Sequence, residues 1–256
     1  DFIVIKMGGS VLSNEDLFNN LIREISILKR LGLSIFLIHG GGSKISKKLN
    51  DLNIKSNFIN GLRVTDDKII NIVEDVLVEF NKKIVNALKN QSCSAKEITS
   101  KKNNIIIVKP ENDTLGFVGR PTKIKTNILS EILKKNEVPV IASLGLNENN
   151  QTFNINADSV AGAIAKELKA RRLLMLSDVE GVLDKDKKLI PEINSVQAKQ
   201  MILEGVISGG MIPKIDNCLD VAKNGVKGVC IIDGRKNYSI LFELLSDKGS
   251  GTLIRE

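Results

Sequence analysis

Short apolar runs alternate with amphipathic helical patterns along most of this chain. One helix, ending near Gly32, is predicted from apolar residues spaced three or four apart: Leu17, Leu21, Ile25 and Leu28. A longer helix is predicted from Ile69, Val73, Val76, Phe80 and Ile84. Central strands are predicted at Phe2–Ile5, Ile35–Ile38, Ile105–Val108, Val138–Ala142, Leu173–Leu176 and Gly228–Ile232. This alternation favours a mainly parallel sheet covered on both faces, so we expect an α/β protein.

Three further segments have the turn residues of hairpins. They span residues 57–64, 144–155 and 178–190, and Asn149-Asn150 marks the turn of the second. No internal repeat or proline-rich linker divides the chain. We place a lobe boundary near residues 154–156.

The composition is that of an ordinary globular protein. Of the 256 residues, 42% are hydrophobic and 26% charged, and the mean hydropathy is +0.01. No run reaches the roughly 18 apolar residues that cross a bilayer, and no signal-peptide pattern opens the sequence. We therefore expect a cytoplasmic protein without membrane partners. Because the cysteines are odd in number and lack metal-ligand spacing, we expect reduced thiols at Cys93, Cys218 and Cys230.

The formal net charge of +7 suits an anionic partner. The lysines are dispersed along helices, aromatic residues make up 4% of the chain, and tryptophan is absent. Base stacking is therefore poorly supported, and we expect small anionic molecules rather than nucleic acid.

Two glycine-rich loops follow predicted strands. The first is Lys6-Met7-Gly8-Gly9-Ser10, and the second is His39-Gly40-Gly41-Gly42-Ser43. Glycines at a strand-to-helix junction let backbone N–H groups approach an anion, and the helix dipole favours its charge. Two such loops predict a crevice that handles phosphate.

Polar residues at two predicted helix starts, near residues 156 and 211, can each be interpreted in two ways. Asn156 and Asp158 precede a small-residue helix, where an N-cap and a first-turn acid are the simplest interpretation. Lys214 stands where another helix begins, so its charge opposes the dipole unless an anion lies there. A solvated surface lysine is the alternative.

Three other side chains are ambiguous in the same way. Lys6 reaches either the crevice or solvent. Arg63, on a turn, suits a carboxylate ligand or a surface ion pair. His39, the one histidine, is more often packed and hydrogen-bonded than catalytic.

Several motifs in order resemble those of the amino acid kinase family, and within it the branch that phosphorylates N-acetyl-L-glutamate. They are Lys6-Met7-Gly8-Gly9, His39-Gly40-Gly41-Gly42, Asn60-Gly61-Leu62-Arg63-Val64-Thr65-Asp66, Asn154 to Asp158, Ser177 to Val182, Gly209 to Lys214 and Ile232-Asp233-Gly234-Arg235. The resemblance implies a three-layer αβα sandwich. It also implies an N-terminal lobe, residues 1–154, that binds the amino-acid substrate and a C-terminal lobe, residues 155–256, that binds ATP.

The resemblance also implies a role for each matching residue. Lys6 and Lys214 would neutralise the migrating phosphoryl group, with Asp158 orienting both. The acceptor would be bound by Gly41, Gly42, Arg63, Asn154 and Asn156. The nucleotide would be bound by Gly8, Gly9, Asp178, Val179, Glu180, Gly181, Val182, Leu183, Val206, Ile207, Ser208 and Gly210. Mg²⁺ would accompany ATP without a dedicated protein ligand.

The chain departs from the family pattern at Ser94–Ser100, where relatives usually carry Gly-Leu-Ser-Gly. We expect a homo-oligomer, a dimer or, if an N-terminal helix exists, a hexamer regulated by arginine. Three alternatives remain: a kinase for carrier-bound aminoadipate or, more distantly, UMP; a non-catalytic nucleotide or amino-acid sensor; and a nucleic-acid-binding protein.

Overall fold

The computed structural model describes residues 2–9 and 14–256; Ser10, the last residue of the first glycine loop, lies outside them. Two compact units divide the chain. The first contains Asp1–Ile35 and Ala161–Glu256, and the second contains Phe36–Val160. The N-terminal segment thus belongs with the C-terminal part of the chain. The division of ligands between residues 1–154 and 155–256 stays a prediction.

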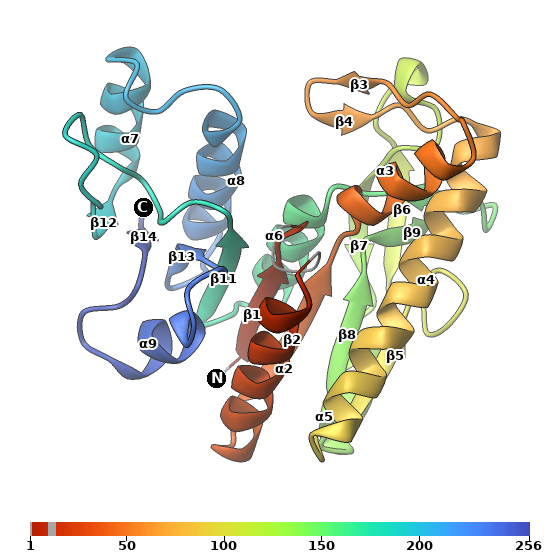
Figure 1. Ribbon diagram of the computed structural model, residues 1–256, viewed down its shortest axis with the longest axis horizontal. Helices are drawn as coiled ribbons and strands as arrows, with labels where there is room; N and C mark the ends of the chain where they lie inside the picture. The colour runs from red at the N-terminus through yellow and green to blue at the C-terminus, as the bar shows by residue number, and fades with distance from the viewer. Residues whose placement is uncertain (1, 10–13) are drawn as a thin grey trace. The chain divides into compact units, whose positions relative to one another are not determined.

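The first unit is built on a mainly parallel sheet (Figure 1). Its strands follow the order β12-β14-β13-β11-β1. Their bounds are β12 (Glu192–Ile193), β14 (Thr252–Ile254), β13 (Val229–Asp233), β11 (Arg172–Ser177) and β1 (Phe2–Met7). Only β13 and β14 pair antiparallel among the described neighbours. The helices that the structure describes in full are α2 (Glu15–Arg30), most of α6 (Ala157–Glu167), α7 (Ser195–Leu203), α8 (Met211–Lys223) and α9 (Ser239–Leu245).

A buried carboxylate joins two helices of this unit. Glu24 of α2 is 3% exposed and accepts hydrogen bonds from the backbone N–H groups of Tyr238, Ile240 and Leu241 at 3.1–3.2 Å. Burial raises the pKa of Glu24, although these three hydrogen bonds oppose the shift. Because the N-cap residue of α9 makes no side-chain capping bond, Glu24 caps that helix from a distance.

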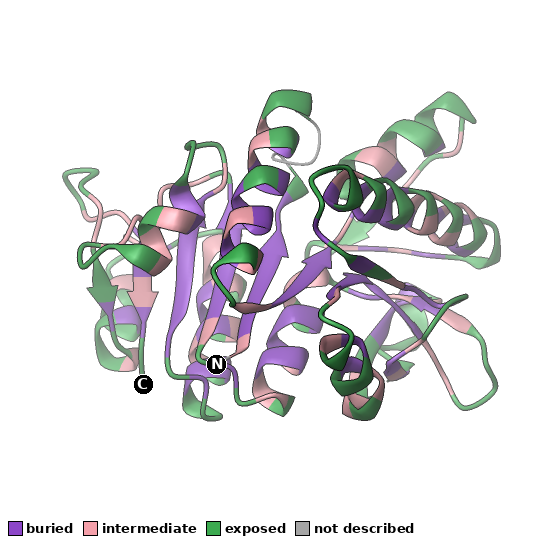
Figure 2. Cartoon of the chain, turned by 90° about the horizontal axis from the view of Figure 1, so that it is seen from below, coloured by how far each residue is buried: buried purple, intermediate pink, exposed green. Residues whose placement is uncertain are grey.

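The second unit contains most of β2 (Ser34–His39), with β8 (Val138–Ala142) and β5 (Ala95–Ile98) following it as parallel strands in that order. The helix α4 (Asp67–Asn90) packs on β5 and β8 and beside α3 (Gly42–Asp51) (Figure 1). The remaining helix is α5 (Thr126–Lys134), which packs on β8. Figure 2 shows the parallel strands of each unit as largely buried, as their continuous apolar runs predict.

The second unit also carries a smaller sheet and a hairpin. The sheet follows the order β10-β9-β6-β7, with bounds Thr152–Asn154, Leu144–Leu146, Ile106–Pro110 and Gly119–Ile124. The hairpin consists of β3 (Phe58–Ile59) and β4 (Leu62–Arg63). A short 3-10 helix, η1 (Asp113–Leu115), lies between β6 and β7.

The α/β prediction with a mainly parallel sheet is confirmed, and two details differ. The run at residues 105–108 is not a central strand: as β6 it pairs antiparallel with β7 in the smaller sheet. The segment Ser94–Ser100 contains β5, which the sequence did not reveal because polar side chains separate its buried Ala95 and Ile98. Among the described residues, no helix combines the length and hydropathy needed to span a membrane.

Candidate functional site

Arg63 lies on β4, directly after the tight turn of the β3–β4 hairpin in the second unit. Asn60 and Gly61 have φ angles of 50° and 78°, the left-handed conformation that a two-residue hairpin turn requires. The turn pairs Arg63 with Phe58 across the hairpin, and the guanidinium carbon lies 4.7 Å from the centroid of that ring. Although it sits on a short hairpin, Arg63 is 6% exposed.

The Arg63 guanidinium donates hydrogen bonds to neutral oxygens. The acceptors are Ser56 Oγ at 2.5 Å, Ser46 Oγ at 2.8 Å and the Gly42 carbonyl at 3.2 Å. No carboxylate of residues 2–9 or 14–256 forms an ion pair with it. Burial lowers the pKa of Arg63, but a guanidinium remains charged at neutral pH. A buried cation without a counter-ion favours binding of an anion, most of all a carboxylate that can accept two hydrogen bonds.

The N-terminus of α3 adds to this positive site. Gly41 is its N-cap residue, makes no side-chain capping bond, and no acidic residue stands in the first turn. A Cβ on Gly41 would lie 2.7 Å from Leu77 Cδ2, whereas one on Gly42 would meet nothing within 4 Å. Gly41 therefore permits close packing on α4, and Gly42 leaves the uncapped backbone N–H groups accessible to an anion.

Asn154 and Asn156 flank the end of β10 and the start of α6. The Asn154 amide Nδ2 donates to Thr65 Oγ1 at 3.4 Å. Asn156 Oδ1 accepts from the backbone N–H groups of Asp158 at 2.8 Å and Ser159 at 3.2 Å, so the predicted cap is confirmed. The predicted contact of Asn156 with substrate stays a prediction.

His39 is a packed structural side chain, as expected. It is fully buried, its Nδ1 lies 3.0 Å from the Gly40 carbonyl, and its ring meets Phe80 edge-on at 5.3 Å between centroids. A carbonyl can only accept, so Nδ1 carries the proton and Nε2 accepts from Asn81 Nδ2 at 3.0 Å. Both ring nitrogens of His39 are therefore occupied by hydrogen bonds within the protein.

This burial makes stability depend on pH. Burial lowers the pKa of His39 from 6.5 to about 4, and the hydrogen bond to Gly40 offsets only part of the effect. Between these values the unfolded chain binds a proton that the folded chain does not, so the free energy of unfolding falls as the pH decreases. When the pH is lowered from 7.5 to 4.5, the free energy of unfolding in urea should fall by roughly 2–3 kcal/mol less for His39→Gln than for the parent. Equal losses would contradict this account.

The first unit gathers the residues predicted to bind nucleotide. Lys6 ends β1 with 7% of its surface exposed, and its Nζ donates to the Leu176 carbonyl at 3.3 Å. A Cβ on Gly8 would lie 2.5 Å from that same carbonyl oxygen, whereas a Cβ on Gly9 would meet no atom within 4 Å. Since β1 and β11 are parallel neighbours, Lys6, Gly9 and Asp178 share the carboxyl edge of the sheet, where α/β proteins bind ligands.

Residues 178–183 are held against β14. The Val182 N–H donates to Thr252 Oγ1 at 2.8 Å, and Gly181 has a φ of 146° with no room for a Cβ beside Thr252. The predicted hairpin is reduced to one antiparallel bridge, between Leu183 and Leu189. The segment is therefore fixed by contacts from outside it rather than by a regular ladder.

The start of α8 is another helix terminus without a side-chain cap, as are the starts of α3 and α5. Its N-cap residue, Gly210, makes no side-chain capping bond, and no acid stands in the first turn. Lys214 lies in that turn and is half-buried. Val206 and Ile207 donate their N–H groups back to the Met201 carbonyl, and Ser208 is exposed beside the helix start. The N–H groups of Met211 and Ile212 donate to the carbonyls of Ser208 and Gly209 at 3.2 Å, and Pro213 has none. The predicted phosphate contact at this terminus therefore depends chiefly on Lys214, and it stays a prediction.

The structure thus assembles two groups of predicted residues, one in each unit. Lys6, Lys214 and the nucleotide segments belong to the first unit, and the acceptor residues belong to the second. Asp158 lies in the second unit, in the first turn of α6, so its contact with both lysines stays a prediction.

The hydrogen bonds of three hydroxyl groups to Arg63 and Asn154 were not predicted: those of Ser46, Ser56 and Thr65. Thr65 belongs to the Asn-Gly-Leu-Arg-Val-Thr-Asp string, which was a usable signal. Ser46 and Ser56 have no comparable signal, because their role depends on where α3 and the loop before β3 lie.

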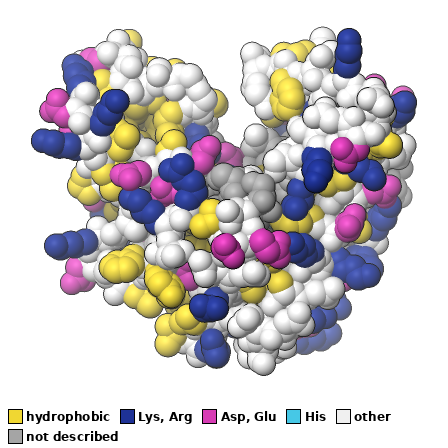
Figure 3. Space-filling model, in the orientation of Figure 1, with side chains coloured by type: hydrophobic (Ala, Val, Ile, Leu, Met, Phe, Trp, Pro, Cys, Tyr) yellow, Lys and Arg dark blue, Asp and Glu magenta, His cyan; other side chains and the backbone are white. Residues whose placement is uncertain are grey.

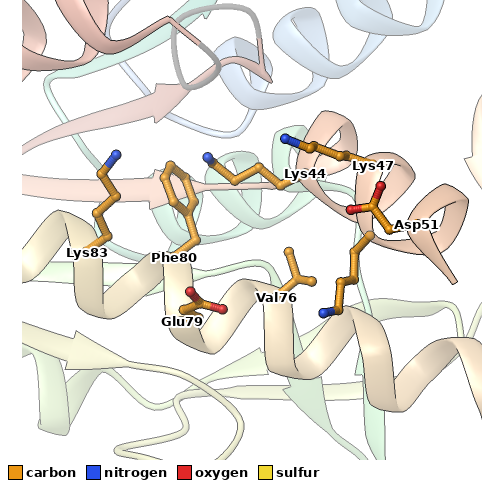
Figure 4. A pocket seen from close by; sticks show the side chains of 8 residues that line it. Lys44, Lys47, Asp51, Val76, Glu79, Phe80 and Lys83 are labelled. Atoms are coloured by element: carbon orange, nitrogen blue, oxygen red, sulfur yellow. The ribbon is translucent and has the colours of Figure 1, made fainter.

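A basic groove lies elsewhere in the second unit, between α3 and α4 (Figure 4). It has a volume of about 250 Å³ and is lined by Lys44, Lys47, Lys48, Asp51, Val76, Glu79, Phe80 and Lys83. Lys44 Nζ lies 4.7 Å from the Phe80 ring centroid. None of the predicted site residues lines this groove. On the face drawn in Figure 3, basic and acidic side chains are interspersed, as the dispersed lysines predicted.

Comparison with known proteins decides the family. The model of the amino acid kinase family matches residues 1–233. The chain belongs to the amino acid kinase family. Within it, the chain is 68% identical to the acetylglutamate kinase of Pelagibacter ubique, over all of this chain and 89% of that protein. It is 42% identical to the acetylglutamate kinase of Rhodospirillum rubrum, over 99% and 86% of the two chains.

A solved structure supports the same family fold. The crystal structure of smu.665 from Streptococcus mutans superimposes with a TM-score of 0.84 at 31% identity and covers 99% of this chain and 98% of that one. The fold expected of an amino acid kinase, a mainly parallel sheet with helices, is therefore confirmed.

Proposed function

We propose that this amino acid kinase transfers the γ-phosphoryl group of ATP to the side-chain carboxylate of N-acetyl-L-glutamate. The products are N-acetylglutamyl 5-phosphate and ADP, and the reaction is the second step of arginine biosynthesis. The observation that carries the proposal is the 68% identity to an acetylglutamate kinase over the whole chain. The buried Arg63 guanidinium, which has only neutral partners among the described residues, supports an acceptor that carries a carboxylate.

The chemistry needs no general base. A side-chain carboxylate with a pKa of about 4.3 is ionised at neutral pH, so its oxygen can attack the γ-phosphorus directly as the bond to the ADP oxygen breaks. This agrees with a neutral, buried His39 whose two nitrogens are occupied. The task of the protein is to align two anions and to offset their repulsion.

The described residues divide that task between them. Lys6 and Lys214 offset charge on the transferring phosphoryl group, and Asp158 orients their ammonium groups. Gly8 and Gly9 offer backbone N–H groups to the phosphates, while residues 178–183, 206–208 and Gly210 hold the nucleotide. Gly41, Gly42, Arg63, Asn154 and Asn156 hold the acceptor.

The other components follow from the same assignment. Mg²⁺ accompanies ATP and is held largely by phosphate oxygens and water, since this ion keeps several waters. The enzyme works in the cytoplasm as a homo-oligomer, with acceptor binding assigned to residues 1–154 and ATP binding to residues 155–256. Lys6, Gly8 and Gly9 are the exception to this division by residue number. Because they belong to the same compact unit as the C-terminal part of the chain, we assign them to ATP binding.

A panel of acceptors tests the proposal. ADP release with MgATP is measured with N-acetyl-L-glutamate, an aminoadipate derivative, UMP and no acceptor. We expect turnover that depends on N-acetyl-L-glutamate. Turnover with UMP or the aminoadipate derivative, and none with N-acetyl-L-glutamate, would assign another substrate; no turnover with any acceptor would favour a sensor.

A further inference from the structure

Thr65 links Arg63 and Asn154, the two residues assigned to the polar groups of the substrate. It is completely buried, and its hydroxyl donates to the Arg63 carbonyl at 2.8 Å. The same oxygen accepts from Asn154 Nδ2 at 3.4 Å. A single buried hydroxyl thus connects the backbone of the arginine to the amide of the asparagine.

The direction of these bonds fixes the orientation of the Asn154 amide. A hydroxyl has one hydrogen, and the Arg63 carbonyl can only accept, so the hydrogen of Thr65 points to Arg63. Thr65 Oγ1 can then only accept from Asn154, which requires the NH₂ side of the amide to face it. The Asn154 carbonyl oxygen is turned away, and it accepts no hydrogen bond from residues 2–9 or 14–256.

A turn from a distant part of the chain holds both residues in register. The Thr65 N–H donates to the Leu115 carbonyl at 3.0 Å, and the Phe117 N–H donates to the Thr65 carbonyl at 2.7 Å. The Asn154 N–H donates to the Phe117 carbonyl at 2.9 Å. Gly116 has a φ of 67°, and a Cβ there would collide with the Thr65 carbonyl oxygen. The distance between Thr65 and Asn154 is therefore set by backbone hydrogen bonds.

We propose that Thr65 is a positioning residue that makes the enzyme select N-acylated acceptors. The inference rests on the proposed function. By fixing the amide of Asn154, Thr65 presents its carbonyl oxygen as an acceptor for the N–H of the acetamido group. A substrate analogue with an oxygen in place of that N–H cannot donate this hydrogen bond. Its oxygen and the Asn154 carbonyl oxygen would also lie close together and repel each other.

The first test compares a substitution that removes the Thr65 hydroxyl with one that keeps it. Thr65→Val removes the hydroxyl, so the KM for N-acetyl-L-glutamate should rise about tenfold, while kcat and the KM for ATP stay within about twofold of the parent. Thr65→Ser keeps the hydroxyl and should restore the parent KM. A folded Thr65→Val enzyme with the parent KM would overturn the inference, as would equal changes in both KM values.

The second test needs no variant and so does not depend on folding. The parent enzyme is assayed with 2-acetoxyglutarate, in which an ester oxygen replaces the N–H of N-acetyl-L-glutamate. We expect kcat/KM to be about tenfold lower for the ester. Equal values for both acceptors would overturn the inference and leave the proposed function intact. Turnover with neither acceptor would instead overturn the proposed function.

Discussion

Replacing Lys214 by alanine is expected to lower kcat about 10³-fold while the Kd for ATP changes by no more than about threefold. A fixed cation beside a phosphoryl group interacts most strongly with the charge of the transition state, and such groups contribute a factor of about 10² to 10³. Lys214 stands in the first turn of α8, where the helix dipole disfavours a cation unless an anion is also bound. Steady-state kinetics and equilibrium titration with an ATP analogue measure the two effects separately.

Lys223 provides the matched control. It lies in the last turn of the same helix and is exposed, so Lys223→Ala removes the same charge without reaching the start of α8. Its kcat should stay within about twofold of the parent. If Lys214→Ala and Lys223→Ala have the same kcat, Lys214 has no part in the transfer.

Replacing Arg63 by alanine should raise the KM for N-acetyl-L-glutamate about 100-fold, with the KM for ATP nearly unchanged. The variant removes a buried charge and the hydrogen bonds that it is expected to donate to the acceptor carboxylate, which together contribute about 3 kcal/mol. Arg63→Lys keeps the charge but loses the planar fork, and its KM should lie between those of the parent and the alanine variant. Initial rates at varied acceptor and saturating ATP give these values.

Arg120 is the control for charge. It belongs to the same unit, on β7, and is exposed, so Arg120→Ala should leave the KM for the acceptor unchanged. A KM that rises equally in both variants would mean that net charge, rather than a specific carboxylate site, determines acceptor binding.

Much of the fold was predictable because its central strands are buried on both faces. Runs such as Val138–Ala142 and Leu173–Leu176 are continuously apolar, and both are central parallel strands. The run at residues 105–108 is equally apolar but belongs to the smaller sheet, since composition does not specify the partner of a strand. β5 was missed because a short strand with polar residues between Ala95 and Ile98 has no distinctive pattern.

The candidate site was predictable where one residue type has few other uses. Arg63 in a turn and Lys214 at a helix start were candidates from the sequence, each with a surface role as the alternative, and their roles in binding and transfer stay predictions. The hydroxyls of Ser46 and Ser56 that hold Arg63 were not recognisable, because serine is common and these contacts join distant segments. The capping role of Asn156 was predictable from its position before α6, since capping is local.

Trapping the product with hydroxylamine tests the central claim most directly. An acyl phosphate reacts with hydroxylamine to give a hydroxamate, and mass spectrometry with fragmentation locates the modified carboxyl group. With MgATP and N-acetyl-L-glutamate, the parent enzyme should form the side-chain hydroxamate, and the Lys214→Ala variant should form it about 10³ times more slowly. ATP consumption without a hydroxamate, or a hydroxamate at the α-carboxyl group, would contradict phosphorylation of the side chain.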